Sequence, residues 1–438
     1  MTVKDVLKKY SEVSLIKRII VGMVLGVILA LIMINVDHSA SVFASIDSII
    51  VLLGTLFVNA LKAVAPILVF FLVISALANA KSAGNMKTII VLYIISTVVA
   101  AVIAYIASVV FPLEVTLIQD PSVEQSSPEG IGSVLSNLVL SIMSNPVDAL
   151  MNANFIGILA WAVALGIALR AASESVKNVF GNVADAMGKV VHWVIQLAPF
   201  GIMGLVYTSV SQNGMEIFIE YGQLIVALVL CMAAIALVTN PLIVFLYTRR
   251  NPYPLVFRCL KDSGITAFFM RSSAANIPVN LDLCEKLGLE KDTYSVSIPL
   301  GSTINMAGAA VTITMMSMTA AHTLGISVDP VTGVILCVLA AVSAAGASGV
   351  AGGSLLLIPL CCSLLGISAD VSMQVVAIGF IIGVVQDSCE TAINSSSDVL
   401  FTATADYRRQ IKEGKEVHMG KDAPTPEDLA AEQEQALA

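Results

Sequence analysis

Long apolar runs recur through most of this sequence and are separated by short polar segments. A helix needs about 20 predominantly apolar residues to cross the ~30 Å hydrocarbon core of a bilayer. Such runs lie at residues 17–36, 43–78, 88–112, 131–170, 190–209, 221–248, 293–320 and 371–404, the fourth interrupted by polar residues and Pro146. Only 12% of the 438 residues are charged, against about 25% in soluble domains. We therefore predict an all-α membrane protein with eight transmembrane helices.

The basic residues indicate how these helices are oriented. A secretory signal is the alternative for the first run, but its length and the many runs that follow favour a retained helix. Lysine and arginine recur in alternate short loops, on the same side as the basic N-terminus, and the opposite loops lack them. Because basic loops stay in the cytoplasm, both termini are predicted to be cytoplasmic. The C-terminal tail, residues 405–438, is predicted to be cytoplasmic and disordered, since most of it is acidic and polar.

Two segments are too short to cross the membrane and return on themselves. Residues 333–343 and 355–365 are apolar arms that flank a glycine-rich stretch, and residues 271–276 interrupt a second apolar segment in a similar way. An arm of about eleven residues spans only ~16 Å. We predict re-entrant hairpins near residues 255–285 and 329–365, whose tips line a binding site. Close helix packing through small residues is the alternative for the glycine-rich tip.

Three acidic residues lie within the final apolar run. Residues 292–407 contain no lysine or arginine, yet they include Asp387, Glu390 and Asp398. Each such carboxylate costs about 2.5 to 3.5 kcal/mol in hydrocarbon, so we expect a metal cation or an ammonium group to compensate. At about 100° per residue, Thr391 and Asn394 share one helix face with all three. The alternative is that these groups are solvated at the cytoplasmic helix end.

The preceding run contains a glycine- and asparagine-bearing motif. Residues 301–308 read Gly-Ser-Thr-Ile-Asn-Met-Ala-Gly, which would loosen a helix and free backbone carbonyls. Hard cations such as Na⁺ prefer carbonyl, amide and carboxylate oxygens. A packing kink is the alternative. The four histidines lie near predicted membrane boundaries or in loops, which argues against a histidine proton relay.

The order of these motifs along the chain resembles that of a known family. The serine-rich tip at 271–278, the motif at 301–308, the glycine-rich second tip and residues 387–398 together resemble the dicarboxylate/amino acid:cation symporters, the glutamate transporter family. The resemblance covers nearly the whole chain and is most specific from about 255 to 405. It implies a glutamate-transporter-like fold in a bacterial inner membrane and a small amino-acid substrate.

The resemblance also implies site residues. Asp387 would hold the substrate ammonium, Asn394 would hydrogen-bond its backbone end, and Ser272, Ser273 and Thr391 would meet its carboxylate. One Na⁺ would bind Asp398, Asn305 and the carbonyls of Gly301 and Asn394. A second would lie between the 303–306 turn and the glycine-rich hairpin. The residues expected at this second site are Thr303, Asn305, Met306, Ser343, Ala344 and Ala345.

Two departures from the family pattern bear on the substrate. Members that carry acidic substrates have an arginine where this chain has Glu390. Glu390 would repel a second carboxylate and accept a hydrogen bond from a hydroxyl group, so serine and threonine are the expected substrates. The family's aspartate in the 301–308 motif is Ala307 here, so fewer coupled sodium ions are expected, although Tyr93, Ser96 and Thr97 match other ligands of that cation site.

The implied activity is Na⁺-coupled uptake by an elevator motion, not enzymatic catalysis. A transport unit (79–112 and 221–404) would move against scaffold and oligomerisation helices (1–78 and 113–220) in a homotrimer. Within transporters, the alternatives are an acidic or broad neutral amino-acid substrate, or coupling to protons. The alternatives to a transporter are a cation channel and an intramembrane aspartyl hydrolase. For the hydrolase, Asp387 and Asp398 lie about 16 Å apart along one helix, too far for a catalytic pair.

Overall fold

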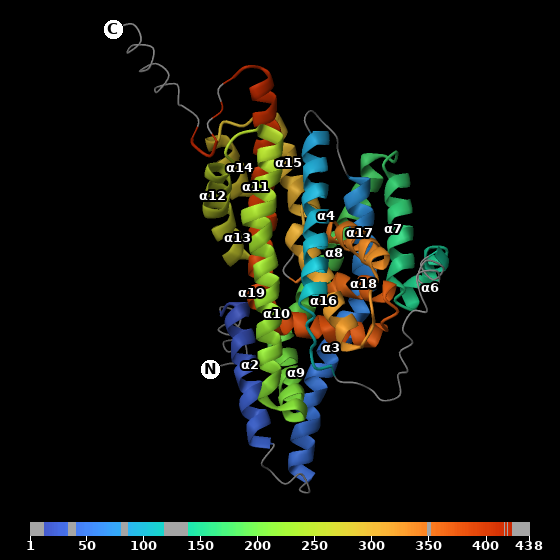
Figure 1. Cartoon of the computed structure of the whole chain (residues 1–438). Coiled ribbons are helices and arrows are strands. Elements are labelled where there is room, and N and C mark those ends of the chain that lie inside the picture. The colour runs from blue at the N-terminus through green and yellow to red at the C-terminus, as the bar shows by residue number, and fades with distance from the viewer. Residues whose placement is uncertain are drawn as a thin grey trace, which may run out of the picture.

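The computed structural model describes residues 13–33, 41–79, 86–117, 139–347, 352–415, 417 and 419–422, and these form helices with no strand among them. Figure 1 shows a bundle of long helices with shorter helix pairs packed at its sides. The α-helices are α2 (Leu15–Met33), α3 (Ser41–Ala78), α4 (Met86–Val110), α6 (Pro146–Met151), α7 (Phe155–Leu169), α8 (Glu174–Gln196), α9 (Ala198–Asn213), α10 (Ile217–Ala234), α11 (Asn240–Thr248), α12 (Tyr253–Cys259), α13 (Ile265–Met270), α14 (Ile277–Lys286), α15 (Lys291–Ile304), α16 (Ala307–Thr323), α17 (Pro330–Ala344), α18 (Ile358–Leu364) and α19 (Ala369–Lys412). Short 3₁₀ segments lie at Gly214–Glu216 (η1) and Ser354–Leu357 (η4), and π-helical segments at Ile235–Thr239 (η2) and Leu260–Gly264 (η3).

Five described helical segments are long and apolar enough to cross a membrane, and a sixth is bent. The five are Ser45–Ser75, Met86–Val110, Gly214–Thr248, Lys291–Thr323 and Ala369–Lys412. The bent pair, α8 and α9, turns by 51° at Leu197, where Pro199 occupies the first turn of α9 and sterically disfavours a continuous helix. The all-helical membrane architecture is thus confirmed. The predicted total of eight crossings is larger than the five or six that satisfy this test.

Two helices form the centre of the bundle. Every residue of α16 from Ala307 to Ala321 is buried, and so is nearly all of α19 from Val371 to Tyr407. Both helices carry many alanine, serine and threonine side chains, and small side chains let helix backbones approach closely within a membrane. By contrast, α2, α4 and α10 expose large apolar side chains, such as Val24, Ile94 and Leu230. The polar residues of the candidate site therefore lie in the interior.

The first short-helix pair (hairpin 1) is held together by a buried amide network. It consists of α12, η3 and α13, a turn beginning at Arg271, and α14, which packs back on η3. The Asn276 amide donates to Ser395 Oγ at 2.9 Å, and the Asn280 amide donates to the Ser395 carbonyl at 3.1 Å. Buried amides whose hydrogen bonds are satisfied specify one packing arrangement. Hairpin 1 is therefore fixed in place against α19.

The second short-helix pair (hairpin 2) consists of α17, η4 and α18. Asp329 caps the start of α17 by accepting hydrogen bonds from the backbone amides of Val331 and Thr332, which satisfies donors that a helix N-terminus leaves unpaired. Helix α18 contacts α17, so the chain doubles back here as well. Part of the glycine-rich tip, residues 348–351, lies outside the described residues.

The C-terminal segment differs from the predicted disordered tail at 405–438. Helix α19 continues to Lys412, and Val417 and Met419 pack against the apolar cluster around Leu255 in hairpin 1. Asp422 pairs with Arg258 at 2.8 Å. Composition favoured disorder, but a few apolar side chains and one ion pair find partners on hairpin 1, which sequence alone does not reveal. Residues 423–438 lie outside the described residues.

Candidate functional site

Helices α15 and α16 are separated by a non-helical break at Asn305 and Met306. Their backbone angles, φ −92° and ψ 83° for Asn305 and φ −124° and ψ 48° for Met306, are not helical. A break at this depth is tolerated where the backbone is buried in protein or lines a cavity. The motif at 301–308 predicted the break itself, and the structure shows that it lies against the polar face of α19.

Asp398 and Asn305 carry two buried oxygens that lack partners. The Asn305 amide donates to Asp398 Oδ1 at 2.9 Å and to the Asn394 carbonyl at 3.2 Å. Asp398 Oδ2 and Asn305 Oδ1 have no hydrogen-bond partner in the described part of the chain, although both residues are fully buried. A buried carboxylate without a compensating charge is costly, and these oxygens are the kind that Na⁺ prefers. The local chemistry therefore fits a bound sodium ion.

Gly301 allows this close approach. A Cβ atom at this position would lie 2.6 Å from Asp398 Oδ1 and 2.8 Å from the Tyr93 hydroxyl. Only glycine leaves space for that carboxylate, because real Cβ contacts are essentially never shorter than 3.0 Å. The structure thus brings together Gly301, Asn305, Asn394 and Asp398, the four residues predicted to bind the first sodium ion.

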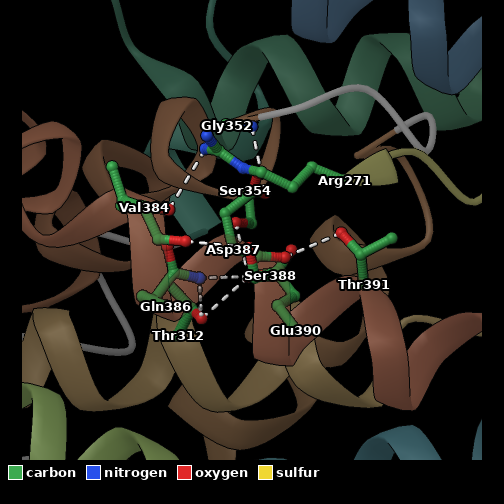
Figure 2. Close-up of polar contacts among 11 residues, drawn as sticks. Arg271, Thr312, Gly352, Ser354, Val384, Gln386, Asp387, Ser388, Glu390 and Thr391 are labelled. Carbon is green, nitrogen blue, oxygen red and sulfur yellow. Dashed lines mark hydrogen bonds and ion pairs between the residues drawn. The ribbon is translucent and has the colours of Figure 1, made fainter. Parts of the chain in front are cut away.

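Asp387 has a protein cation beside it, which corrects one sequence-based expectation. Arg271, at the tip of hairpin 1, donates from Nε to Asp387 Oδ2 at 2.7 Å and from its terminal nitrogen to the Gly383 carbonyl at 3.1 Å (Figure 2). The backbone amide of Gly352, in hairpin 2, donates to Asp387 Oδ1 at 3.1 Å. The expectation that only an external cation would compensate these carboxylates was therefore wrong for Asp387. Arg271 lies outside residues 292–407, and only folding brings it close.

Glu390 has one oxygen surrounded by neutral donors. Its Oε2 atom accepts hydrogen bonds from Thr312 Oγ1 at 2.8 Å, Ser354 Oγ at 2.8 Å and Gln386 Nε2 at 2.5 Å (Figure 2). These donors come from α16, from η4 and from α19 itself. The predicted alternative of a solvated carboxylate does not apply, since Glu390 is 5% exposed and lies in the interior. Three fixed donors hold the carboxylate in one orientation.

The other predicted site residues lie around these groups. Asn394 accepts from the Gly308 amide at 2.8 Å, Thr391 Oγ1 donates to the Asp387 carbonyl at 2.7 Å, and Met306 contacts the Asn394 amide through its sulfur. Ser273 is buried in the hairpin 1 tip, and Ser272 Oγ accepts from the Ala275 amide.

The residues predicted for the second sodium site are not joined by hydrogen bonds in the described part of the chain. Thr303 Oγ1 and Ser343 Oγ donate to carbonyls within their own helices, those of Leu300 and Ala340. Ala344 and Ala345 end α17. No contact joins the 303–306 turn directly to Ser343, Ala344 or Ala345 among the described hydrogen bonds, so the second sodium site stays a prediction.

Comparison with known proteins identifies the family. The model of the sodium:dicarboxylate symporter family matches residues 15–407. The chain belongs to this family. It is 56% identical over 405 residues to the serine/threonine transporter SstT of Streptococcus agalactiae serotype III (strain NEM316), a match that covers 92% of this chain and 98% of that protein. It is 53% identical over 411 residues to the protein of the same name from Streptococcus thermophilus (strain ATCC BAA-250 / LMG 18311), covering 93% of this chain and all of that protein.

Membership in a symporter family identifies the protein as a membrane transporter and not an enzyme. Sequence analysis nevertheless assigned no individual role to Arg271, Thr312, Ser354 or Gln386, although Arg271 and Ser354 lie in the predicted hairpin tips. Thr312 is one small polar residue among many in α16, Ser354 is one of several in the glycine-rich tip, and nothing in their spacing distinguishes them. Gln386 had a usable signal, because it lies four residues before Glu390 and i, i+4 pairs are neighbours on a helix.

Arg271→Ala should destabilise the protein in the absence of sodium and substrate. Removing one partner of a buried ion pair leaves the other charge uncompensated, at a cost of about 3 to 5 kcal/mol. Thermal unfolding of the purified protein measures this loss. Arg258→Ala in the same hairpin is the matched control, because Arg258 pairs with the more exposed Asp262 and Asp422 and such pairs contribute about 1 kcal/mol or less. Equal effects of the two substitutions would contradict the role of the Arg271–Asp387 pair.

Proposed function

We propose that this protein is a symporter that couples Na⁺ entry to the uptake of serine and threonine. Two findings support it: family membership over residues 15–407, and high identity to proteins named serine/threonine transporters. The observation that carries the substrate assignment is the buried carboxylate of Glu390. Its Oε2 atom is occupied by three protein donors.

The second oxygen of Glu390 is the proposed acceptor for the substrate hydroxyl. The Oε1 atom of Glu390 accepts no hydrogen bond from any described residue. It is also not one of the fully buried polar atoms without a partner, so it keeps some accessible surface. A hydroxyl group donates to a carboxylate oxygen, whereas an additional carboxylate on the substrate would be repelled. A site built around such a bond discriminates against analogues that lack the hydroxyl. Serine and threonine are therefore favoured over alanine and over aspartate.

The amino and carboxyl groups of the substrate would bind on either side of this position. Asp387 is the proposed partner of the ammonium group, which would share or displace the contact with Arg271 seen at 2.7 Å. Ser272 and Ser273, in the hairpin 1 tip, are the proposed partners of the carboxylate, with Thr391 beside them. Asn394 would hydrogen-bond the backbone end of the substrate. When no substrate is bound, Arg271 would neutralise Asp387 and so lower the free-energy cost of burying this carboxylate.

Sodium would be coupled to the substrate through shared elements. Asp398, Asn305, Gly301 and the Asn394 carbonyl would hold one ion, and Asn394 would also contact the substrate. Occupancy of one site then pre-orders the other, so each ligand raises the affinity for the other, which is reciprocal thermodynamic coupling. A second ion would lie between Thr303, Asn305 and Met306 and the end of α17 at Ser343, Ala344 and Ala345.

The proposed topology and motion follow the family resemblance. Eight transmembrane helices and two re-entrant hairpins would lie in the bacterial inner membrane, with both termini cytoplasmic. Residues 79–112 and 221–404 would form a transport unit that moves as an elevator against residues 1–78 and 113–220, in a homotrimer. The two buried central helices, α16 and α19, both fall within the proposed transport unit.

Gln386→Leu should weaken serine binding without removing the carboxylate. Gln386 is a positioning residue in this proposal, and hydrogen bonds to charged groups contribute about 1.5 to 3 kcal/mol. We therefore expect the serine concentration at half-maximal uptake to rise by about tenfold or more, with little change in the maximal rate. The matched control is Gln374→Leu on the same helix, outside the Glu390 network. An unchanged serine affinity in Gln386→Leu would show that the hydrogen bond from Gln386 to Glu390 is not needed for serine binding.

Uptake of radiolabelled serine into proteoliposomes tests the function. A sodium gradient should drive serine accumulation that threonine competes with and that alanine and aspartate compete with weakly. Accumulation at fixed pH without sodium would indicate proton coupling instead. Sodium flux that is neither saturable nor dependent on serine would indicate a channel.

A further inference from the structure

An apolar cavity of about 480 Å³ lies between two groups of helices. One side is formed by α3 and α7, represented by Leu77 and Val163. The other is formed by α4, α15 and α17, represented by Ile94, Leu300 and Val338. Its size is within the range of about 300 to 1,000 Å³ that is usual for ligand sites. The candidate substrate site is elsewhere, since neither Asp387 nor Glu390 lines this cavity.

Only two of the lining residues are polar, and they differ in their pairing. Thr97 Oγ1 already donates to the Tyr93 carbonyl at 2.8 Å. Arg170, the C-cap residue that follows α7, is exposed and forms no ion pair with any of the described residues. The cavity lining is therefore apolar except for Thr97 and one cation that has no ion-pair partner among the described residues. A ligand that complements it has an apolar chain and an anionic group.

We propose that this cavity binds one acyl chain of an anionic phospholipid from the surrounding bilayer, with its phosphate group beside Arg170. The positive-inside rule places Arg170 in the cytoplasmic leaflet, whose anionic lipids bind basic pockets between transmembrane helices. The acyl chain itself provides little preference, because lipid tails are as apolar as the cavity wall. Arg170 therefore determines which lipid is retained.

This position gives the bound lipid a place in transport. Helices α3 and α7 belong to the proposed scaffold, and α4, α15 and α17 belong to the proposed transport unit. An acyl chain between them lies on the boundary where the two groups would slide, so the chain must move or leave during each cycle. The binding site itself does not depend on the proposed function, since it follows from the cavity and Arg170 alone.

Photocrosslinking with lipid probes tests the site. The purified full-length protein is reconstituted into phosphatidylcholine vesicles that contain a trace of phosphatidylglycerol, phosphatidylcholine or free fatty acid, each with a diazirine on the same acyl chain. Labelled peptides are then identified by mass spectrometry. We expect lining residues such as Leu300 and Val338 to be labelled about fivefold more by the phosphatidylglycerol probe than by the phosphatidylcholine probe.

Two test variants, each with a matched control, separate the head-group contact from the cavity. Arg170→Gln should abolish the fivefold preference, and Arg249→Gln, at the end of α11 and outside the cavity, should preserve it. Val163→Trp should reduce labelling of Leu300 by both phospholipid probes, whereas Val91→Trp on the lipid-facing side of α4 should not. Leu77→Phe replaces Val163→Trp if that variant is not monodisperse.

Four results would overturn the proposal. The first is equal labelling by the two phospholipid probes, and the second is a preference that survives Arg170→Gln. The third is labelling of Leu300 no greater than that of Val91, which would indicate ordinary surrounding lipid. Stronger labelling by the free fatty acid than by phosphatidylglycerol would assign the cavity to a different ligand and would also overturn the phospholipid assignment.

Discussion

Asp398→Asn is expected to raise the sodium concentration that supports half-maximal serine uptake by about 10² to 10³. Asp398 is fully buried, and its Oδ2 atom has no partner among the described residues. In the proposed symporter, this carboxylate supplies the negative charge of the first sodium site. Losing one partner of a buried charge pair costs about 3 to 5 kcal/mol, and every 1.4 kcal/mol is a factor of ten in affinity. Sodium-dependent uptake in proteoliposomes measures the change.

The same variant should be more stable than the parent protein when sodium is absent. Asparagine has nearly the same shape and carries no charge, so the unpaired buried charge disappears. Without sodium, the thermal unfolding midpoint of Asp398→Asn should therefore be higher than that of the parent protein. Adding sodium should shift the midpoint of the variant very little. Asp370→Asn, near the exposed start of the same helix, is the control and should keep the sodium-induced shift. A normal sodium dependence in Asp398→Asn would refute the assigned ion site.

Glu390→Arg is expected to lower the apparent affinity for serine by at least about 100-fold. The substitution removes the proposed acceptor of the substrate hydroxyl and places a cation close to Arg271. Loss of a charged hydrogen bond costs about 1.5 to 3 kcal/mol, and repulsion between like charges in the interior adds to this. Competition of unlabelled amino acids against residual uptake should show that aspartate now inhibits, because the new cation attracts a second carboxylate.

Glu390→Gln distinguishes loss of charge from loss of the acceptor. The glutamine side chain is nearly isosteric and keeps an oxygen that accepts a hydrogen bond. Serine affinity should therefore fall by about tenfold or less, and aspartate should still compete weakly. If Glu390→Arg binds serine as well as the parent protein does, residue 390 does not face the substrate.

The sequence was most informative where a local pattern has one physical cause. Apolar runs of about 20 residues predicted membrane helices, and the described segments confirm five, or six with the bent pair. The spacing of Asp387, Glu390, Asn394 and Asp398 predicted a shared polar face, and these residues are buried together on α19. The break at Asn305 was expected from this asparagine and the two glycines of the 301–308 motif. These are local properties of one helix or one turn.

Sequence was least informative where the partner is distant along the chain. Arg271 lies 116 positions from Asp387, and Ser354 lies 36 positions from Glu390. The packing of Met419 on hairpin 1 was missed for the same reason, since composition suggested only a polar tail. A chain of this length offers many possible pairs at such separations, and local propensity does not choose among them.

The sequence by itself determined that the chain is helical and resides in a membrane, because hydrocarbon leaves few ways to satisfy a polar backbone. It also placed a row of carboxylates on one helix face. Only the tertiary structure decided which groups compensate those carboxylates. Asp387 receives a guanidinium from hairpin 1, Glu390 receives three neutral donors, and Asp398 keeps one oxygen without a partner among the described residues. The physical reason is that charge compensation acts over a few ångströms in space, regardless of separation along the chain.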